Sequence, residues 1–159
     1  MATNNAINHT LPQATQGFLA FDSVAGTDVT GDGSDYSIIY ETESYDVGSN
    51  YNTATGQFTA PATGKYFFTL GVYLDTISNT HTTGYLQLKN VTTGDLVTSA
   101  ISNPYNRSYW SQARLDMTYL LPLTAGDIVE PIINISGGTK TIWVRELRNW
   151  FACYLVTNL

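Results

Sequence analysis

Hydrophobic and polar residues alternate along this chain in short runs, and no stretch keeps a helical period for three turns. Turn residues such as Asp32-Gly33 and Gly137-Gly138 separate the runs about every ten residues. A period of two with regular turn signals is typical of an all-β sandwich. The pattern predicts strands at 17–22, 36–42, 56–60, 65–75, 84–91, 95–101, 109–121, 127–135 and 147–157.

The runs 65–75, 109–121 and 147–157 are apolar on both faces. In the first of them, Phe68 faces the expected core while Phe67 faces the other way. An antiparallel strand with two apolar faces needs a cover on its outer side, and the pattern predicts no helix for that role. We therefore expect a second subunit on this face. The alternative is a monomer whose outer aromatic side chains are partly exposed.

The composition narrows the possible partners. The 159 residues fit one domain, 13% of them are charged, and the net charge is −6. With this excess of acidic residues, the sequence lacks the basic surface that nucleic-acid binding requires. No apolar run reaches the roughly 18 residues of a membrane span. We therefore predict neither a nucleic-acid partner nor insertion into a membrane.

The start of the chain differs from the rest. The first fifteen residues are polar and show neither the basic start nor the apolar stretch of a secretory signal. We expect residues 1–15 to form a flexible N-terminal arm or tether. Residues 16–159 are expected to form a single folded domain.

No combination of residues in the sequence predicts a catalytic centre. His9 lies in the polar arm and His81 in a loop rich in Asn and Thr, and neither has a nucleophile motif nearby. Both are interpreted as surface histidines. Cys153, the only cysteine, lies in an apolar run and is interpreted as a buried structural thiol. We predict that the protein is not an enzyme.

One loop gathers the residue types of a calcium site. Asp28, Asp32 and Asp35 surround two glycines, and carboxylates in a tight loop are ligands that Ca²⁺ prefers. The segment fails the helix–loop–helix template because its twelfth position is Ile39 rather than Glu. A plain Asp-Gly turn is the alternative, so we predict no cofactor and keep calcium at these three residues as the open case.

A second loop offers a candidate ligand site. Tyr105, Arg107 and Tyr109 lie close together in the sequence SNPYNRSYW. Aromatic and Arg side chains are the types that contacts with carbohydrates and proteins use. Trp110 either belongs to this surface or is buried between subunits, and the sequence leaves both possibilities open.

The central segment resembles the signature of the complement C1q globular head, which is related to the tumour necrosis factor (TNF) fold. The later stretch Leu121–Val129 resembles the turn and strand L-x-x-G-D-x-V of that family, and Trp150–Leu155 is similar to its closing strand, with Cys153 where glycine is usual. Two signature positions differ conservatively, because tyrosine replaces the first phenylalanine and leucine replaces the last aromatic residue. The signature positions are all occupied at the expected spacing, by Tyr40, Asp46, Tyr51, Phe58, Gly64, Tyr66, Phe68 and Leu70.

The resemblance implies an antiparallel jelly-roll β-sandwich of about ten strands that assembles as a homotrimer. In that family the trimer packs around a three-fold axis through one sheet, which would cover the second apolar faces. The trimer interface is therefore expected to contain Phe67, Tyr73, Trp110, Arg114, Asp116, Trp150 and Tyr154.

The function predicted on this basis is a non-enzymatic trimeric attachment module from a phage, a virus or a bacterium. The first hypothesis is a virion structural protein, either a tail-fibre or spike tip or a capsid decoration protein. It would lie on the virion surface and bind a virion protein or a host-surface receptor or glycan. The alternative is a secreted recognition protein of a cell, lectin-like or cytokine-like.

Overall fold

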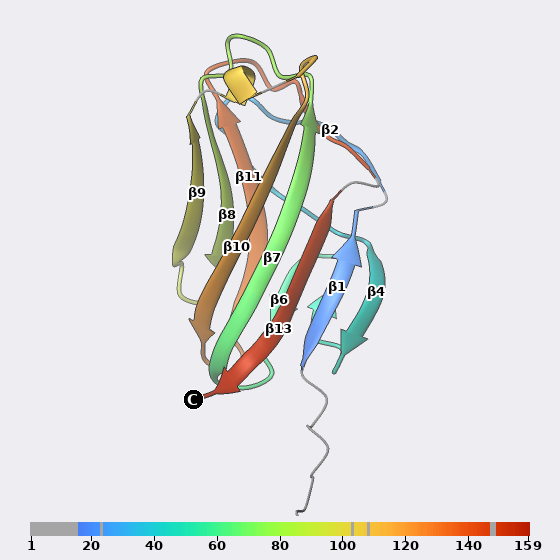
Figure 1. Ribbon diagram of the computed structural model, residues 1–159, viewed down its shortest axis with the longest axis vertical. Helices are drawn as coiled ribbons and strands as arrows, with labels where there is room; N and C mark the ends of the chain where they lie inside the picture. The colour runs from blue at the N-terminus through green and yellow to red at the C-terminus, as the bar shows by residue number, and fades with distance from the viewer. Residues whose placement is uncertain (1–15, 23, 103, 108, 147–148) are drawn as a thin grey trace, which may run out of the picture.

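Alternating side chains build two antiparallel sheets that pack face to face (Figure 1). The computed structural model describes residues 16–22, 24–102, 104–107, 109–146 and 149–159. We name each sheet after its central strand. The β7 sheet contains seven strands: β1 (Gly17–Phe21), β2 (Gly26–Thr30), β4 (Thr42–Val47), β7 (Gly64–Asp75), β10 (Ala113–Leu123), β12 (Ile142–Val144) and β13 (Trp150–Asn158).

The second layer, the β11 sheet, lies behind the first in Figure 1. Its six strands are β3 (Asp35–Ser37), β5 (Tyr51–Asn52), β6 (Gln57–Thr59), β8 (Thr83–Asn90), β9 (Leu96–Ser102) and β11 (Ile128–Ser136). A short 3-10 helix, η1 (Pro104–Arg107), follows β9 at one end of the sandwich. These elements confirm the all-β jelly-roll prediction.

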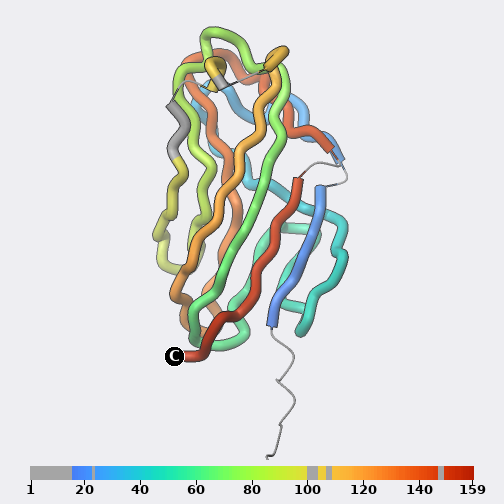
Figure 2. Tube along the Cα trace, in the orientation of Figure 1, coloured from blue at the N-terminus to red at the C-terminus, as the bar shows by residue number. Residues whose placement is uncertain are grey.

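The long strand β7 organises its sheet. One edge of β7 pairs with β10 along its whole length, from Ala113 opposite Leu74 to Leu123 opposite Gly64. The other edge pairs first with β13 and then, beyond it, with β12. Strand β13 continues the sheet to β1 and β4. The tube trace in Figure 2 shows that the C-terminus and the start of β1 lie at the same end of the molecule.

Aromatic rings from both sheets fill the core. Phe18 of β1 stacks on Tyr51 of β5 with ring centroids 4.4 Å apart, and its edge meets Phe151 of β13 at 4.9 Å. Phe58 meets Phe68 edge to face at 5.8 Å. Burying each such ring stabilises the fold by roughly 1.5–3 kcal/mol, so this cluster holds the two sheets together.

The residues of the signature sequence have structural roles in this core. The hydroxyl of Tyr51 donates to the carbonyl of Tyr40 at 3.0 Å, and the amide of Tyr51 donates to Asp46 at 2.8 Å. The hydroxyl of Tyr66 donates to the carbonyl of Ala62 at 2.6 Å. Gly64 lies against β13, where a Cβ atom would overlap the backbone of Thr157. The remaining signature side chains, Phe58, Phe68 and Leu70, are buried.

Two of the predicted strands differ from the structure. Only the ends of the run 36–42 lie in strands, because the chain leaves the sheet between Ile38 and Glu41; Thr42 begins β4, and residues 43–47 of that strand were not predicted. The run 109–121 starts as a strand only at Ala113. The short strands β2, β5 and β12 were not predicted, because their few residues show no alternation. The arm 1–15 lies outside the described residues.

Within the described part of the chain, no helix is long and apolar enough to cross a membrane.

Candidate subunit interface and aromatic turn

The outer face of the β7 sheet carries the candidate interface. Strand register aligns its side chains in rows across β10, β7 and β13. We call this surface the aromatic face and define it by Leu120, Phe67 and Tyr154 in one row, Thr118, Thr69 and Ala152 in the next, then Asp116, Gly71 and Trp150, and finally Arg114 and Tyr73.

The first row forms an apolar ridge. Leu120 lies opposite Phe67, and Phe67 lies opposite Tyr154 on its other side. The rings of Phe67 and Tyr154 are 5.3 Å apart. Leu120 and Tyr154 are each 47% exposed, although large apolar side chains on adjacent strands are ordinarily covered.

The second row is made of smaller side chains, Thr118, Thr69 and Ala152. They separate the ridge from a second large group on the face, the ring of Trp150. The aromatic face therefore has a relief of large, small and large rows. A surface of this shape can interlock with another surface, because rows of large side chains fit rows of small ones.

Trp150 lies flat against the sheet because residue 71 is glycine. A Cβ atom on Gly71 would overlap the ring of Trp150. On the other side of the ring, the guanidinium carbon of Arg114 lies 4.2 Å from its centroid. The Nε of Arg114 also donates to Asp116 at 3.0 Å. Cation–π contact and ion pair together fix the guanidinium group on the face.

The second candidate site is a two-residue turn at the end of the sandwich opposite the C-terminus (Figure 1). Tyr109 and Gln112 form an isolated bridge, and Trp110 and Ser111 between them have φ angles of 55° and 65°. We call Tyr109–Gln112 the aromatic turn. Its rings are open to solvent, because Tyr109 is 77% and Trp110 82% exposed. The two rings stack 5.7 Å apart.

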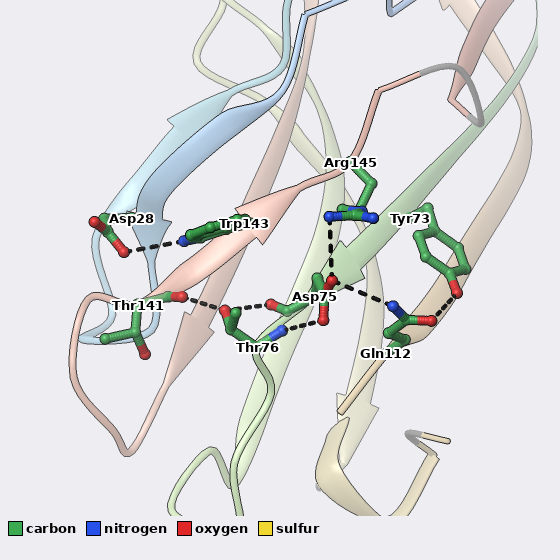
Figure 3. A network of polar contacts seen from close by, with 8 residues as sticks. All are labelled: Asp28, Tyr73, Asp75, Thr76, Gln112, Thr141, Trp143 and Arg145. Atoms are coloured by element: carbon green, nitrogen blue, oxygen red, sulfur yellow. Dashed lines mark hydrogen bonds and ion pairs between the residues drawn. The ribbon is translucent and has the colours of Figure 1, made fainter. Parts of the chain in front are cut away.

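A polar network holds the base of the aromatic turn (Figure 3). The Nε2 of Gln112 donates to Asp75 at 3.2 Å, and the hydroxyl of Tyr73 donates to the Oε1 of Gln112 at 2.6 Å. Arg145 forms an ion pair with Asp75 at 3.5 Å. The amide of Ile77 also donates to the carbonyl of Ser111 at 2.9 Å. The aromatic rings therefore project from a well-anchored base.

The structure brings six of the seven predicted interface residues to one face: Phe67, Tyr73, Arg114, Asp116, Trp150 and Tyr154. Trp110 lies elsewhere. Strand alternation does not extend to Trp110, because the chain turns at 110–111 and β10 begins only at Ala113.

The predicted ligand residues lie together at one end of the molecule. Tyr105 is exposed on η1, and η1 contacts the start of β10, next to which Tyr109 lies. Arg107 belongs to the same helix, and its side chain lies outside the described atoms. From the sequence, Trp110 could belong either to this end or to the subunit face. The turn at Trp110 and Ser111 was not predicted, because it has neither the Gly nor the Asn that usually marks such turns.

The three carboxylates of the candidate calcium loop are engaged separately. Asp28 accepts from the indole of Trp143 at 3.2 Å, Asp32 from the hydroxyl of Ser34 at 2.6 Å, and Asp35 from Asn134. The hydrogen bonds from Ser34 lower the pKa of the Asp32 carboxyl. Within the described residues, no group of three or more His, Cys, Asp or Glu lies close enough to hold a metal ion. The loop therefore does not gather its acids around one point.

The interpretation of His81 as a surface residue is wrong. Its ring is fully buried. Its Nδ1 accepts from the amide of Ser78 at 2.9 Å, and its Nε2 lies 3.2 Å from the carbonyl of Thr139. The backbone at residues 31 and 138 can pass close to the ring because both residues are glycine; a Cβ atom at either position would overlap the ring. His81 is therefore a structural side chain that ties neighbouring loops together.

Cys153 is buried on β13, where the sequence placed it. Burial raises the pKa of its thiol well above the usual range. A thiol in this state is a poor nucleophile.

Asp22, directly after β1, was not singled out from the sequence. Its side chain is buried and accepts from Asn149 at 2.8 Å and from the amide of Val24 at 3.0 Å. Burial raises the pKa of this carboxyl to about 6, and the neighbouring Glu41 adds to the rise. The burial of Asp22 could not be predicted from its position at the end of a strand, because it depends on Asn149 from the other end of the chain.

Comparison with known proteins defines the family. The model of the C1q domain matches residues 20–142. The chain belongs to the C1q domain family. The match spans the central strands of the sandwich, so the resemblance seen in the signature residues is confirmed.

Solved structures show the same fold for this C1q domain. The globular domain of zebrafish complement 1qA superimposes with a TM-score of 0.62 at 16% identity, covering 91% of this chain and 99% of that chain. Murine APRIL gives 0.59 at 10% identity, with coverages of 89% and 99%. Eiger TNF from S. frugiperda gives 0.58 at 14% identity, with coverages of 92% and 96%. A search of curated proteins finds no significant match.

Proposed function

We propose that this C1q domain is a non-enzymatic homotrimeric binding module that assembles through its aromatic face. The observation that carries the proposal is the apolar ridge of Leu120, Phe67 and Tyr154, which stays half exposed in the single chain. Covering such a ridge is favourable by roughly 25 cal/mol per Å² of apolar surface. C1q and TNF domains homotrimerise and bind receptors or ligands.

The alternation of rows of large and small side chains on the aromatic face supports assembly of three chains around a three-fold axis. In a cyclic trimer the contacts are head to tail: one patch of each copy meets a different patch of the next copy, and all three contacts are identical. The ridge on one copy then meets a different part of the face on its neighbour, such as the small side chains of Thr69 and Ala152. The rows described above supply both parts on one chain.

Ligand contact is proposed at the other candidate site. Tyr105, Arg107, Tyr109 and Trp110 come from η1 and the aromatic turn, at the end opposite the C-terminus. Tyr, Trp and Arg are the side chains that dominate binding energy in protein contacts. Anchored rings lose little conformational freedom on binding, which favours this turn as the contact surface.

Attachment is the role that we infer for the module. An extracellular or secreted site is typical of the family, which favours secreted recognition. Display on a virion surface, as a fibre or spike tip or as capsid decoration, stays a prediction. Mass spectrometry of purified particles and of culture medium from the source distinguishes the two, because only a virion component copurifies with intact particles.

Light scattering on the purified chain tests the assembly. We expect a mass three times that of one chain, and Tyr154→Asp is expected to give monomers. Tyr85→Asp is the matched control, since Tyr85 is 36% exposed but lies on the outer face of the β11 sheet; it should leave the trimer intact. A monomeric wild-type chain would overturn the proposal, as would equal effects of the two substitutions.

A further inference from the structure

A pair of opposite charges lies on the aromatic face, and its hydrogen bonding is incomplete. The Nε of Arg114 donates to the Oδ1 of Asp116 at 3.0 Å. Among the described residues, no partner is found for the two terminal nitrogens of Arg114 or for the Oδ2 of Asp116. Both side chains remain partly exposed. The pair therefore keeps donors on one side chain and an acceptor on the other.

These groups constrain what can cover the face. An apolar surface laid over Arg114 and Asp116 would remove water from charged groups without replacing their hydrogen bonds, which is strongly unfavourable. A suitable partner must offer hydrogen-bond acceptors to Arg114 and a donor to Asp116, and a carboxylate and a cation form the strongest such bonds. A second copy of the chain offers both groups.

We propose that Arg114 of each protomer pairs with Asp116 of the next protomer around the ring, and that this exchange fixes the register of the trimer. The inference rests on the homotrimer proposed above. A head-to-tail contact suits it, because each chain then gives its Arg114 to one neighbour and its Asp116 to the other.

Trp150 prepares Arg114 for this contact. The indole ring lies under the guanidinium group at 4.2 Å, and Gly71 lets the ring lie flat on the sheet. The planar guanidinium carries five N–H donors in a fixed arrangement, and the intrachain bond uses only the one on Nε. The terminal nitrogens can therefore reach a carboxylate on a neighbouring chain with little further loss of freedom.

Charge reversal tests the exchange. Arg114→Asp leaves two acids on the patch, and Asp116→Arg leaves two cations. Each variant alone would place like charges at all contacts of the ring, so we expect the concentration for half assembly to rise by roughly tenfold or more. Light scattering over a dilution series measures this concentration, and raising the salt concentration should reduce the penalty.

Mixing the two variants separates contacts between chains from effects within one chain. In a mixed trimer two contacts join opposite charges and one joins like charges. An equal mixture should therefore assemble at lower concentration than either variant alone. If the pair acts only within its own chain, mixing restores nothing, and the proposal is overturned.

Lys89→Glu provides the matched control. Lys89 forms an ion pair with Glu130 at 3.8 Å on the other outer face, with a side chain about as exposed as that of Arg114. This reversal should leave assembly unchanged, and thermal melts of all variants confirm folding. A trimeric wild type that is insensitive to both reversals rejects the charge exchange alone, whereas a monomeric wild type rejects the trimer itself.

Discussion

On the outer face of the β11 sheet, polar side chains bond one another beside the exposed Tyr85 and Leu96. Lys89 pairs with Glu130, which also accepts from Gln57 at 3.0 Å. Gln87 donates to Thr98 at 2.9 Å. The aromatic face of the β7 sheet instead carries a half-exposed apolar ridge, a flat indole ring and an ion pair with spare donors.

The difference between these two faces lies in what their side chains leave unpaired. Both sheets send alternate side chains to a shared core, so alternation alone does not distinguish them. Polar neighbours that bond one another need only water around them. Exposed rings and a partly bonded charge pair gain from a surface of matching shape and charge. The composition of the outward rows therefore supports the proposal that the aromatic face is the one that meets another subunit.

Among the substitutions that test the difference between the two faces, Gly71→Val should have the largest effect. A side chain at this position would push Trp150 off the sheet and remove the platform under Arg114. We expect loss of the trimer and a decrease of roughly 1–3 kcal/mol in the free energy of unfolding. Light scattering and chemical denaturation measure the two effects.

The matched variant for this test is Gln87→Val, in the middle of β8 on the other outer face. It should change the free energy of unfolding by less than about 1 kcal/mol and leave assembly intact. Equal loss of assembly in both variants would contradict the assignment of the interface to the aromatic face.

Changing the pH should affect the β7 sheet through Asp22, by lowering the free energy of unfolding without abolishing assembly. The pKa of Asp22 is raised from 3.8 to about 6 in the fold, so the folded state binds more protons than the unfolded state between these values. Its stabilising contribution is complete below about pH 4 and is lost as the pH rises through about 6. We expect the free energy of unfolding to fall by roughly 1–3 kcal/mol over this range.

Denaturation curves at several pH values measure this loss. Asp22→Asn removes the titrating group while its amide oxygen can still accept from Asn149, so it should flatten the pH dependence. Glu130→Gln on the opposite sheet should leave the slope in place. A slope that persists in Asp22→Asn would show that another group titrates.

Chelation of calcium is expected to have the smallest effect. Asp28, Asp32 and Asp35 each accept a hydrogen bond from a different partner, and the described residues do not gather three metal-ligating side chains at one place. We expect the same mass by light scattering and the same melting temperature with and without EDTA. A trimer that dissociates in EDTA would establish a structural metal site.

Alternation along the sequence was sufficient to predict the sandwich and most of the residues that share the aromatic face. It placed Phe67, Arg114 and Trp150 on the same outer surface, because these residues lie in regular strands whose pairing keeps the period of two. The spacing of the signature residues predicted the jelly roll for a similar reason, since Tyr40, Tyr51 and their partners form the core that the fold requires.

The failures occurred where backbone conformation or distant contacts decide the outcome. Trp110 and Ser111 adopt left-handed φ angles that such residues rarely take, so a turn could not be predicted there from residue type. His81 is buried by loops from distant parts of the chain. The pKa of Asp22 is raised because the fold buries its carboxyl group, and Glu41 beside it adds to the rise. The contacts of His81 with Thr139 and of Asp22 with Asn149 join segments that are far apart in the sequence.

The buried thiol of Cys153 has a use in chemical labelling. It is the only cysteine of the chain, and burial on β13 keeps it from reacting in the folded state. A maleimide should therefore modify only a cysteine introduced at an exposed position, for example by Ser111→Cys in the aromatic turn. In the unchanged protein the same reagent would report opening of the sandwich, because Cys153 becomes available only when the two sheets separate.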